Sequence, residues 1–145
     1  MSDTSQPPSA AARRVSDFLS EQGFRPHFDE EGDIVFKVEG MTWLVLFSPD
    51  DAEFYRLCVP NFWSVDDEDE AMAVEVASDY VNARVKSAKV FRVQSDTWAA
   101  LEGFYAEPEH FIAVLPRALG AVKACVVEFL RLMQDDSDEP RGPAN

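Results

Sequence analysis

Three closely spaced segments rich in β-branched and aromatic residues determine the fold class of this chain more strongly than any other feature. They run from Ile34 to Val38, from Met41 to Phe47 and from Glu53 to Val59, and each is separated from the next by a turn of only a few residues. Connections this short join antiparallel strands, because a parallel crossover needs a dozen or more residues. With a further extended stretch from Phe24 to Asp29, the pattern predicts a meander of three or four antiparallel strands.

Helical periodicity appears in one segment before this meander and in two segments after it. A first amphipathic helix is expected from about Ser9, a plausible N-cap, to Gln22, and Gly23 suits the position that follows a helix end. A second helix is expected to begin within the acidic run from Ser64 to Glu70 and to end near Val85, because acids favour the first helical turn. Its predicted buried stripe is Met72, Ala73, Val76, Ala77, Tyr80 and Val81.

A second hairpin and a long last helix complete the pattern. Lys89 to Gln94 and Thr97 to Tyr105 predict two strands that turn at Ser95-Asp96. The last helix is expected from Glu107 to about Met133, with Pro116 kinking it or dividing it in two. Its predicted buried stripe is Phe111, Val114, Leu115, Ala118, Val122, Cys125, Val126, Phe129 and Met133.

This order of elements predicts an α+β fold. Strands and helices that follow one another in clusters, with short hairpin links, favour an antiparallel sheet of five to six strands packed against helices, in the order α-β-β-β(-β)-α-β-β-α. A length of 145 residues fits one domain, which we place at residues 9–133. The polar residues 1–8 and the acidic residues 134–145 are expected to be disordered tails, since they contain too little apolar surface to offset their ordering entropy.

Charge narrows the class of partner. The formal net charge is −14, and the two expected tails hold only −4 of it, so the body keeps −10. A field of this sign repels nucleic-acid phosphates and anionic membrane surfaces, which argues against both partners. We expect no membrane-spanning segment and no signal peptide. The only two cysteines, Cys58 and Cys125, form neither a disulfide framework nor a metal motif, which favours a reducing cytoplasm.

No group of residues has the pattern of a catalytic or metal site. The acidic run Asp66 to Glu70 lacks the glycine and the ligand spacing of a calcium loop, and the acidic turn from Asp29 to Asp33 lacks the closing glutamate. His27 and His110 stand apart from any ligand set, and both cysteines occupy apolar periodic positions, which is typical of small core residues. We therefore expect no enzyme, no cofactor and no metal.

The expected sheet carries large apolar residues on both faces. In the strand from Met41 to Phe47, Trp43 and Val45 point to one face of the sheet, and Leu44 and Leu46 point to the other. The neighbouring strands alternate in a similar way. Either the first or the last helix crosses to the second face, or that face is an interface with another polypeptide. For the second case the predicted partner or dimer surface is Leu44, Leu46, Phe54, Trp98 and Phe104.

The order of elements, the turn Glu31-Gly32-Asp33 and a helix that ends with Val81-Asn82 resemble the YbjN-type family over roughly Ala10 to Met133. Members of this family are small bacterial proteins often labelled sensory-transduction regulators, and their fold is similar to that of type III secretion chaperones. The resemblance implies an α+β sheet backed by helices, commonly a homodimer, with no catalytic residues to carry over.

These observations predict a non-enzymatic protein-interaction domain with a chaperone-like or regulatory role. It is expected to bind a partner polypeptide, or a second copy of itself, on an apolar sheet or helix surface. An alternative from another class is a small-molecule-binding regulatory domain whose pocket lies between the sheet and the last helix, near Pro116.

Overall fold

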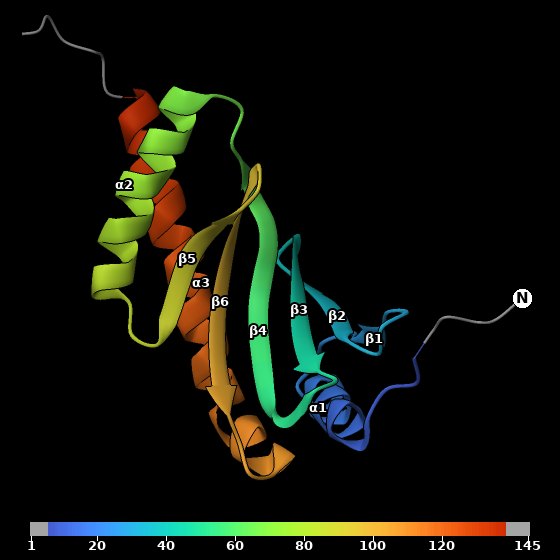
Figure 1. The fold of residues 1–145 in the computed structure, drawn as a ribbon. Coiled ribbons are helices and arrows are strands. Elements are labelled where there is room, and N and C mark those ends of the chain that lie inside the picture. Colours follow the sequence, from blue (N-terminus) through green and yellow to red (C-terminus); the bar gives the residue numbers. More distant parts are fainter. Residues whose placement is uncertain (1–5, 139–145) are drawn as a thin grey trace, which may run out of the picture.

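A computed structural model describes residues 6–138 and shows the predicted α+β fold, with a six-stranded antiparallel sheet and three helices (Figure 1). The elements follow in the order α1 (Ala10–Glu21), β1 (His27–Phe28), β2 (Ile34–Val38), β3 (Met41–Ser48), β4 (Asp51–Ser64), α2 (Glu68–Arg84), β5 (Ala88–Val93), β6 (Asp96–Phe104) and α3 (Pro108–Asp138). The expected fold class is confirmed.

The sheet is ordered β1-β2-β3-β4-β6-β5, and all its pairs are antiparallel. The long strand β4 joins the first meander to the second hairpin, because it pairs with β3 on one side and with β6 on the other. Val45, Leu57 and Leu101 are aligned across these three strands, so they share one face of the sheet.

All three helices lie on the face to which Leu57 points. In Figure 1, α1 and α3 lie behind the sheet, and α2 stands beside β5. Helix α3 contacts β4, β5 and β6, α2 contacts α3 and β5, and α1 contacts α3. Within the described residues, no helix crosses to the other face, which we call the open face. The sequence did not decide whether a helix covers this second face. The open face is turned toward the viewer in Figure 1.

Aromatic contacts close the core between the sheet and α3. The ring of Tyr55 from β4 stacks on that of Phe111, with centroids 3.8 Å apart. At the other end of the helix, Phe62 and Trp63 pack edge-on against Phe129, at 5.2 Å and 5.9 Å between centroids. The buried residues of α3 are Phe111, Leu115, Ala118, Val122, Cys125, Val126, Phe129 and Met133. This is the predicted stripe, except for Val114, which is exposed.

The first helix has the predicted ends. The Ser9 hydroxyl accepts a hydrogen bond from the backbone N–H of Ala12 at 3.0 Å, so Ser9 is the N-cap. Gly23 follows the helix end with a φ of +95°, a conformation that favours glycine.

Strand β4 continues past the point where the sequence predicted its end. We expected it to end at Val59, before Pro60, but it runs to Ser64. Between Val59 and Trp63 the register with β6 shifts, and Asn61 has a φ of +51°. This bulge accommodates Pro60, which has no N–H to donate to a partner strand.

The predicted buried stripe of α2 is wrong in three of its six positions. Met72 and Val76 are 66% and 68% exposed, and Tyr80 is exposed as well. The residues that α2 buries are Val74, Ala77 and Val81. The helix carries two adjacent apolar stripes, and it turns the one with the smaller side chains toward α3 and β5.

Helix α3 is longer than expected. It is one continuous helix that contains Pro116, so of the two outcomes expected at this proline, a kink or a division, the division is wrong. It also extends to Asp138, so residues 134–138 of the expected C-terminal tail are helical. Residues 139–145 and 1–5 of the two expected tails lie outside the described residues.

By length and composition alone, residues Pro108–Asp135 of α3 could cross a membrane, and this is the one such helix in the described part of the chain. From the sequence, no membrane-spanning segment was expected. The same test is passed by core helices of soluble proteins. We interpret α3 as a core helix, because its apolar stripe packs on the inner face of the sheet.

Candidate functional site: the open face of the sheet

The five residues predicted for the partner surface all lie on the open face. Leu44 pairs with Cys58, and Leu46 pairs with Arg56. Phe54 pairs with Phe104, two residues along β4 from Arg56. Trp98 pairs with Phe91 of β5 and precedes Phe104 on the same face of β6. The structure therefore brings together the residues that the period-two pattern selected.

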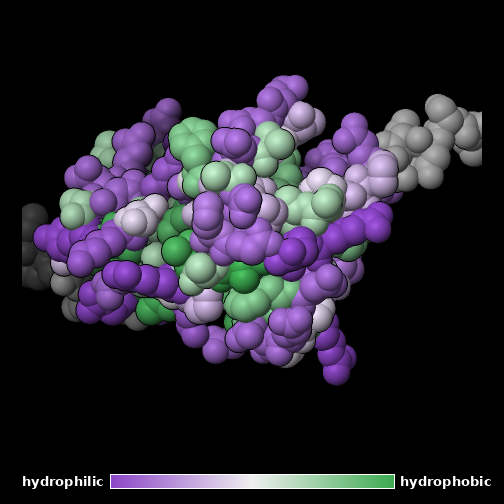
Figure 2. Space-filling view, turned by 90° about the horizontal axis from the view of Figure 1, so that it is seen from below, coloured by the Kyte–Doolittle hydropathy of each residue, from purple (hydrophilic) through white to green (hydrophobic). Residues whose placement is uncertain are grey.

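These side chains are not covered by the helices. Leu44, Leu46, Phe54 and Trp98 are half-buried, and Phe104 is 79% exposed. Their partial burial comes from neighbouring side chains on the same face. The small residues Cys58 and Ala100, which lie between them, are fully buried. In a view of one end of the molecule, apolar residues gather in separate patches on a mostly hydrophilic surface (Figure 2).

Phe54 and Phe104 form an aromatic pair at one end of the open face. Their rings meet edge to face, with centroids 5.9 Å apart. Beside them lies a hollow of about 370 Å³, which is also lined by Ser87, Lys89 and Gly103. An exposed phenyl ring thus stands next to a hollow that is large enough to receive one.

A charged trio occupies the centre of the open face. Glu102 accepts a hydrogen bond from Arg56 at 3.0 Å (Nη2 to Oε2), and its Oε1 lies 2.5 Å from Nζ of Lys89. The hydrogen bond from Lys89, followed by that from Arg56, holds the pKa of Glu102 below its ordinary value against the opposing effect of burial. The trio fixes three side chains between the apolar residues.

A second aromatic pair lies at the other end of the open face. The Trp98 indole N–H donates to the side-chain oxygen of Asn61 at 2.8 Å, and its ring lies 6.4 Å from that of Phe91. Lys89 lies over the Phe91 ring, with its Nζ 5.3 Å from the centroid. Bulky rings therefore frame the leucines and the charged trio at both ends.

The open face lacks the negative excess of the chain. Its strand positions carry three cations, Lys37, Arg56 and Lys89, against the two carboxylates of Asp96 and Glu102. The whole chain carries a net charge of −14. An acidic partner therefore meets less repulsion here than over the chain as a whole.

A separate cleft of about 760 Å³ lies between the sheet and α3, on the helix-covered side. Tyr55 and Leu101 line it from the sheet, and Val114, Ala118 and Ala121 line it from α3, close to Pro116. Three cationic residues also line it, Arg84, Lys86 and Arg117, and Glu102 lines it too, although its carboxylate pairs with Arg56 and Lys89 on the open face. Lys86 and Arg117 take part in no ion pair within the described residues.

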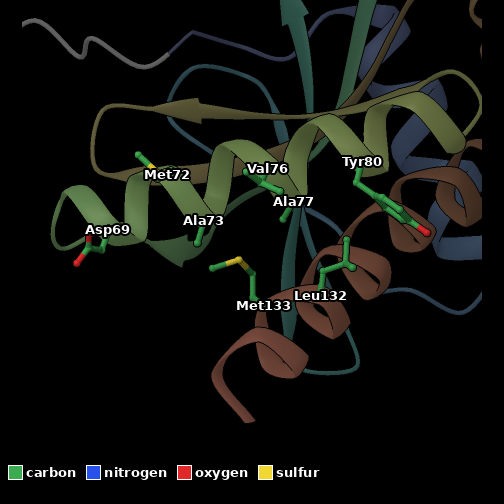
Figure 3. A pocket seen from close by; sticks show the side chains of 8 residues that line it. All are labelled: Asp69, Met72, Ala73, Val76, Ala77, Tyr80, Leu132 and Met133. Atoms are coloured by element: carbon green, nitrogen blue, oxygen red, sulfur yellow. The ribbon is translucent and has the colours of Figure 1, made fainter. Parts of the chain in front are cut away.

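A third feature, a groove between α2 and α3, was not predicted from the sequence. It has a volume of about 400 Å³ and is drawn in Figure 3. Its lining residues are Asp69, Met72, Ala73, Val76, Ala77, Tyr80, Leu132 and Met133. The spacing of Met72, Val76 and Tyr80 was visible in the sequence, but we assigned these residues to the core. Their exposure turns that stripe into a surface.

The acidic segments have structural roles. The Asp67 side chain accepts a hydrogen bond from the N–H of Glu70 at 2.7 Å and caps α2, as expected of the acidic run. In the turn before β2, Asp29 Oδ1 accepts from the N–H groups of Glu31 and Asp33, each at 2.9 Å. Asp33 in turn accepts from the N–H of Phe47 at 2.9 Å and joins this turn to β3.

The remaining candidates for chemistry lie apart from one another. His27 and His110 are exposed, and no group of three or more His, Cys, Asp or Glu within residues 6–138 is placed to hold a metal ion. Burial raises the pKa of the Cys58 thiol to about 12 and that of Cys125 to about 11. Thiols that remain protonated and inaccessible are poor nucleophiles.

Comparison with models of protein families found no match, and a search of curated proteins found no similar sequence. The resemblance to the YbjN-type family therefore stays a prediction.

Proposed function

We propose that this protein is a non-enzymatic interaction domain and that its open face binds a second copy of the chain. The observation that supports this most is the Phe104 ring, 79% exposed, beside a hollow of about 370 Å³ on the same face. A chaperone-like or regulatory role, as the resemblance implies, would use the dimer that this contact forms.

A two-fold axis makes such a face complementary to itself. In a symmetric dimer the same surface patch is used by both subunits, so a projecting group of one meets the recess of the other. Because Phe104 lies beside the hollow, a two-fold rotation can place the Phe104 ring of each subunit in the hollow of the other. The half-buried leucines, Leu44 and Leu46, lie on the same face two strands from β6, and they lose their remaining contact with water where the dimer contact extends across β4.

The energies favour a reversible dimer. Full burial of a Leu or Phe side chain contributes about 1.5–3 kcal/mol, so side chains that are already half-buried gain about half of that. Four such residues and the more exposed Phe104 from each subunit supply on the order of 10 kcal/mol in total. Association costs about 4–15 kcal/mol, which is of the same size. The expected dimer therefore dissociates at low protein concentration.

The test is the double substitution Leu44→Asp with Leu46→Asp. Two carboxylates placed on each copy of the contact should yield a folded monomer, because both leucines lie on the sheet face that no helix within residues 6–138 covers. The matched control is Val127→Asp, a substitution on the exposed side of α3, which should leave the dimer intact. Light scattering after size exclusion gives the mass, and urea unfolding shows whether the fold persists.

Three outcomes contradict the proposal. If the double variant does not fold, the two leucines belong to the core. If the Val127→Asp control also dissociates the protein, the contact lies elsewhere. If the native protein is a monomer at every concentration but binds a different polypeptide through these leucines, the face serves a heterologous partner and not a copy.

The cleft between the sheet and α3 supports a second candidate function, the binding of a small anionic ligand. Its volume of about 760 Å³ lies in the range of ligand sites. Within an acidic chain, three cations gather at this cleft beside apolar walls such as Leu101 and Val114. The arrangement suits a molecule with an apolar body and an anionic group, and it lies near Pro116 as the sequence alternative expected.

Two fluorescent dyes of similar shape test this cleft. The sulfonate 8-anilinonaphthalene-1-sulfonate should bind, and its uncharged analogue N-phenyl-1-naphthylamine should bind more weakly. Arg117→Gln should reduce sulfonate binding about fivefold or more, since a hydrogen bond to a charged group contributes about 1.5–3 kcal/mol when desolvated and less at a wet site. Equal binding of the sulfonate by the native protein and by Arg117→Gln would rule this cleft out as its site.

A further inference from the structure

The groove between α2 and α3 is a second apolar surface, separate from the open face. Met72, Val76 and Tyr80 form one wall, with exposed fractions of 66%, 68% and 38%. Ala73 and Ala77 lie along its floor on the side toward α3, where Met133 points toward them (Figure 3). Large exposed apolar side chains gathered around a groove mark an interaction site.

The spacing of the wall residues fits a helix as the bound element. Met72, Val76 and Tyr80 recur every four residues along α2, which puts successive side chains about 6 Å apart at a rise of about 1.5 Å per residue. Such a row is the ridge against which a third helix packs, and the small side chains of Ala73 and Ala77 let that helix approach closely. A strand is the poorer fit, because the groove is bounded by helices and offers no free strand edge.

Charge defines the chemistry of the partner. Glu75 and Asp79 flank the exposed stripe on the side away from Ala73 and Ala77, and Glu68 and Asp69 lie at its N-terminal end. All four carboxylates are exposed, and none of them takes part in an ion pair within the described residues. The nearest cation on the helix, Arg84, lies over the Tyr80 ring, 3.5 Å from its centroid. A helix with lysines or arginines beside its apolar face complements this surface.

We propose that the groove between α2 and α3 binds a basic amphipathic helix of a partner protein. Apolar side chains of that helix fill the space between Met72, Tyr80 and Met133, and its cations pair with the carboxylates along α2. The open face remains free in this complex, so the dimer and the partner helix use different surfaces. Salt should weaken the complex, because its charge pairs are exposed.

A designed peptide supplies the probe. We would use an amphipathic helical peptide of about 14 residues composed of Leu and Lys, with a second peptide in which every Lys is replaced by Glu. Fluorescence anisotropy with the full chain measures both affinities. The Lys peptide should bind at least tenfold more tightly than the Glu peptide, and the difference should shrink as salt is added.

Two matched substitutions locate the site. Val76→Lys replaces a groove residue, and Val127→Lys replaces a valine that is 50% exposed on α3 outside the groove lining. Both add the same charge to the same type of residue. Val76→Lys should weaken binding of the Lys peptide about tenfold, whereas Val127→Lys should change it less than about twofold. Leu44→Asp with Leu46→Asp should leave peptide binding unchanged, which separates this site from the dimer contact.

Three results would overturn the proposal. Equal losses in the two lysine variants would mean that the peptide responds only to net charge. Equal affinities of the Lys and Glu peptides would remove the charge complementarity. Self-association of the native protein that Val76→Lys abolishes, and that the leucine substitutions leave intact, would assign the groove to a second copy of this chain.

Discussion

The phenol ring of Tyr55 lies directly over the backbone of Gly103, its cross-strand partner. A Cβ atom at Gly103 would lie 2.8 Å from Oη of Tyr55 and 3.0 Å from two carbons of the ring. The ring cannot easily move aside, because it stacks on Phe111 and meets Tyr105 edge-on. This contact holds β6 close to α3 at the end of the sheet where the aromatic pair of the open face stands.

Replacing Gly103 should therefore destabilise the protein. Gly103→Ala forces the Tyr55 ring or the strand to shift, at an expected cost of about 1–3 kcal/mol in the free energy of unfolding. The control is Gly120→Ala in α3, where an added Cβ meets nothing within 4 Å. That variant should gain about 0.5–1 kcal/mol, because alanine favours a helix interior. Urea unfolding of both variants measures the difference, and a Gly103→Ala variant as stable as the native chain would contradict the close contact.

Asn82 protects the outer edge of the sheet. Its Oδ1 accepts from the N–H of Val90 at 2.6 Å, and its Nδ2 donates to the Val90 carbonyl at 3.0 Å, so it pairs with β5 as another strand would. Asn82→Ala leaves both backbone groups without this partner and should cost about 1–3 kcal/mol. Hydrogen exchange should become faster at the Val90 amide than at amides of the central strand β4. Unchanged exchange at Val90 would show that the Asn82 side chain does not protect this edge.

The charged trio gives stability a defined pH dependence. The folded pKa of Glu102 is held below its ordinary value of 4.5 by Lys89 and Arg56, so its contribution is present above that pH and is lost as the pH falls through the lower folded pKa. Glu102→Gln should destabilise the protein by about 1 kcal/mol at pH 7. This deficit should vanish in acid, below the folded pKa, where the native side chain is protonated too.

Unfolding midpoints measured across this pH range test the trio. Glu75→Gln on the exposed surface of α2 is the control, and its stability should follow that of the native chain. A Glu102→Gln deficit that persists undiminished in acid would show that packing, and not the charge of Glu102, stabilises this part of the sheet.

The two thiols should be inert in the folded protein. Cys58 and Cys125 are fully buried, with pKa values raised to about 12 and about 11. A thiol reagent at pH 8 should modify neither cysteine on a time scale in which the urea-unfolded chain reacts completely. Rapid modification of the native protein would indicate an accessible thiolate and would reopen the possibility of cysteine chemistry.

Local patterns were sufficient to predict the elements of this fold. The short turns required antiparallel pairing, and Ser9, Gly23 and the acidic residues before α2 marked helix ends that the structure confirms. The end of β4 could not be predicted, because Pro60 is tolerated only through a bulge that depends on the register with β6. The orientation of α2 could not be predicted either, since both of its stripes are apolar and only packing against α3 decides which is buried.

The candidate site was predictable to the same extent. Alternation along β3 placed Leu44 and Leu46 on the face opposite Trp43, which no helix of the described residues covers. The hollow beside Phe104 was not predictable, because it is formed by residues of β4, β5 and β6 together. The cationic cleft likewise joins Arg84 to Arg117, two residues that no sequence spacing relates.

Sedimentation equilibrium of the unmodified chain over a range of concentrations tests the self-association of the open face most directly. We predict a mass that rises from the 16.3 kDa of one chain to about twice that value as concentration increases, with dissociation on dilution. A single species of 16.3 kDa at all concentrations would contradict the proposal that a second copy covers Leu44, Leu46 and Phe104.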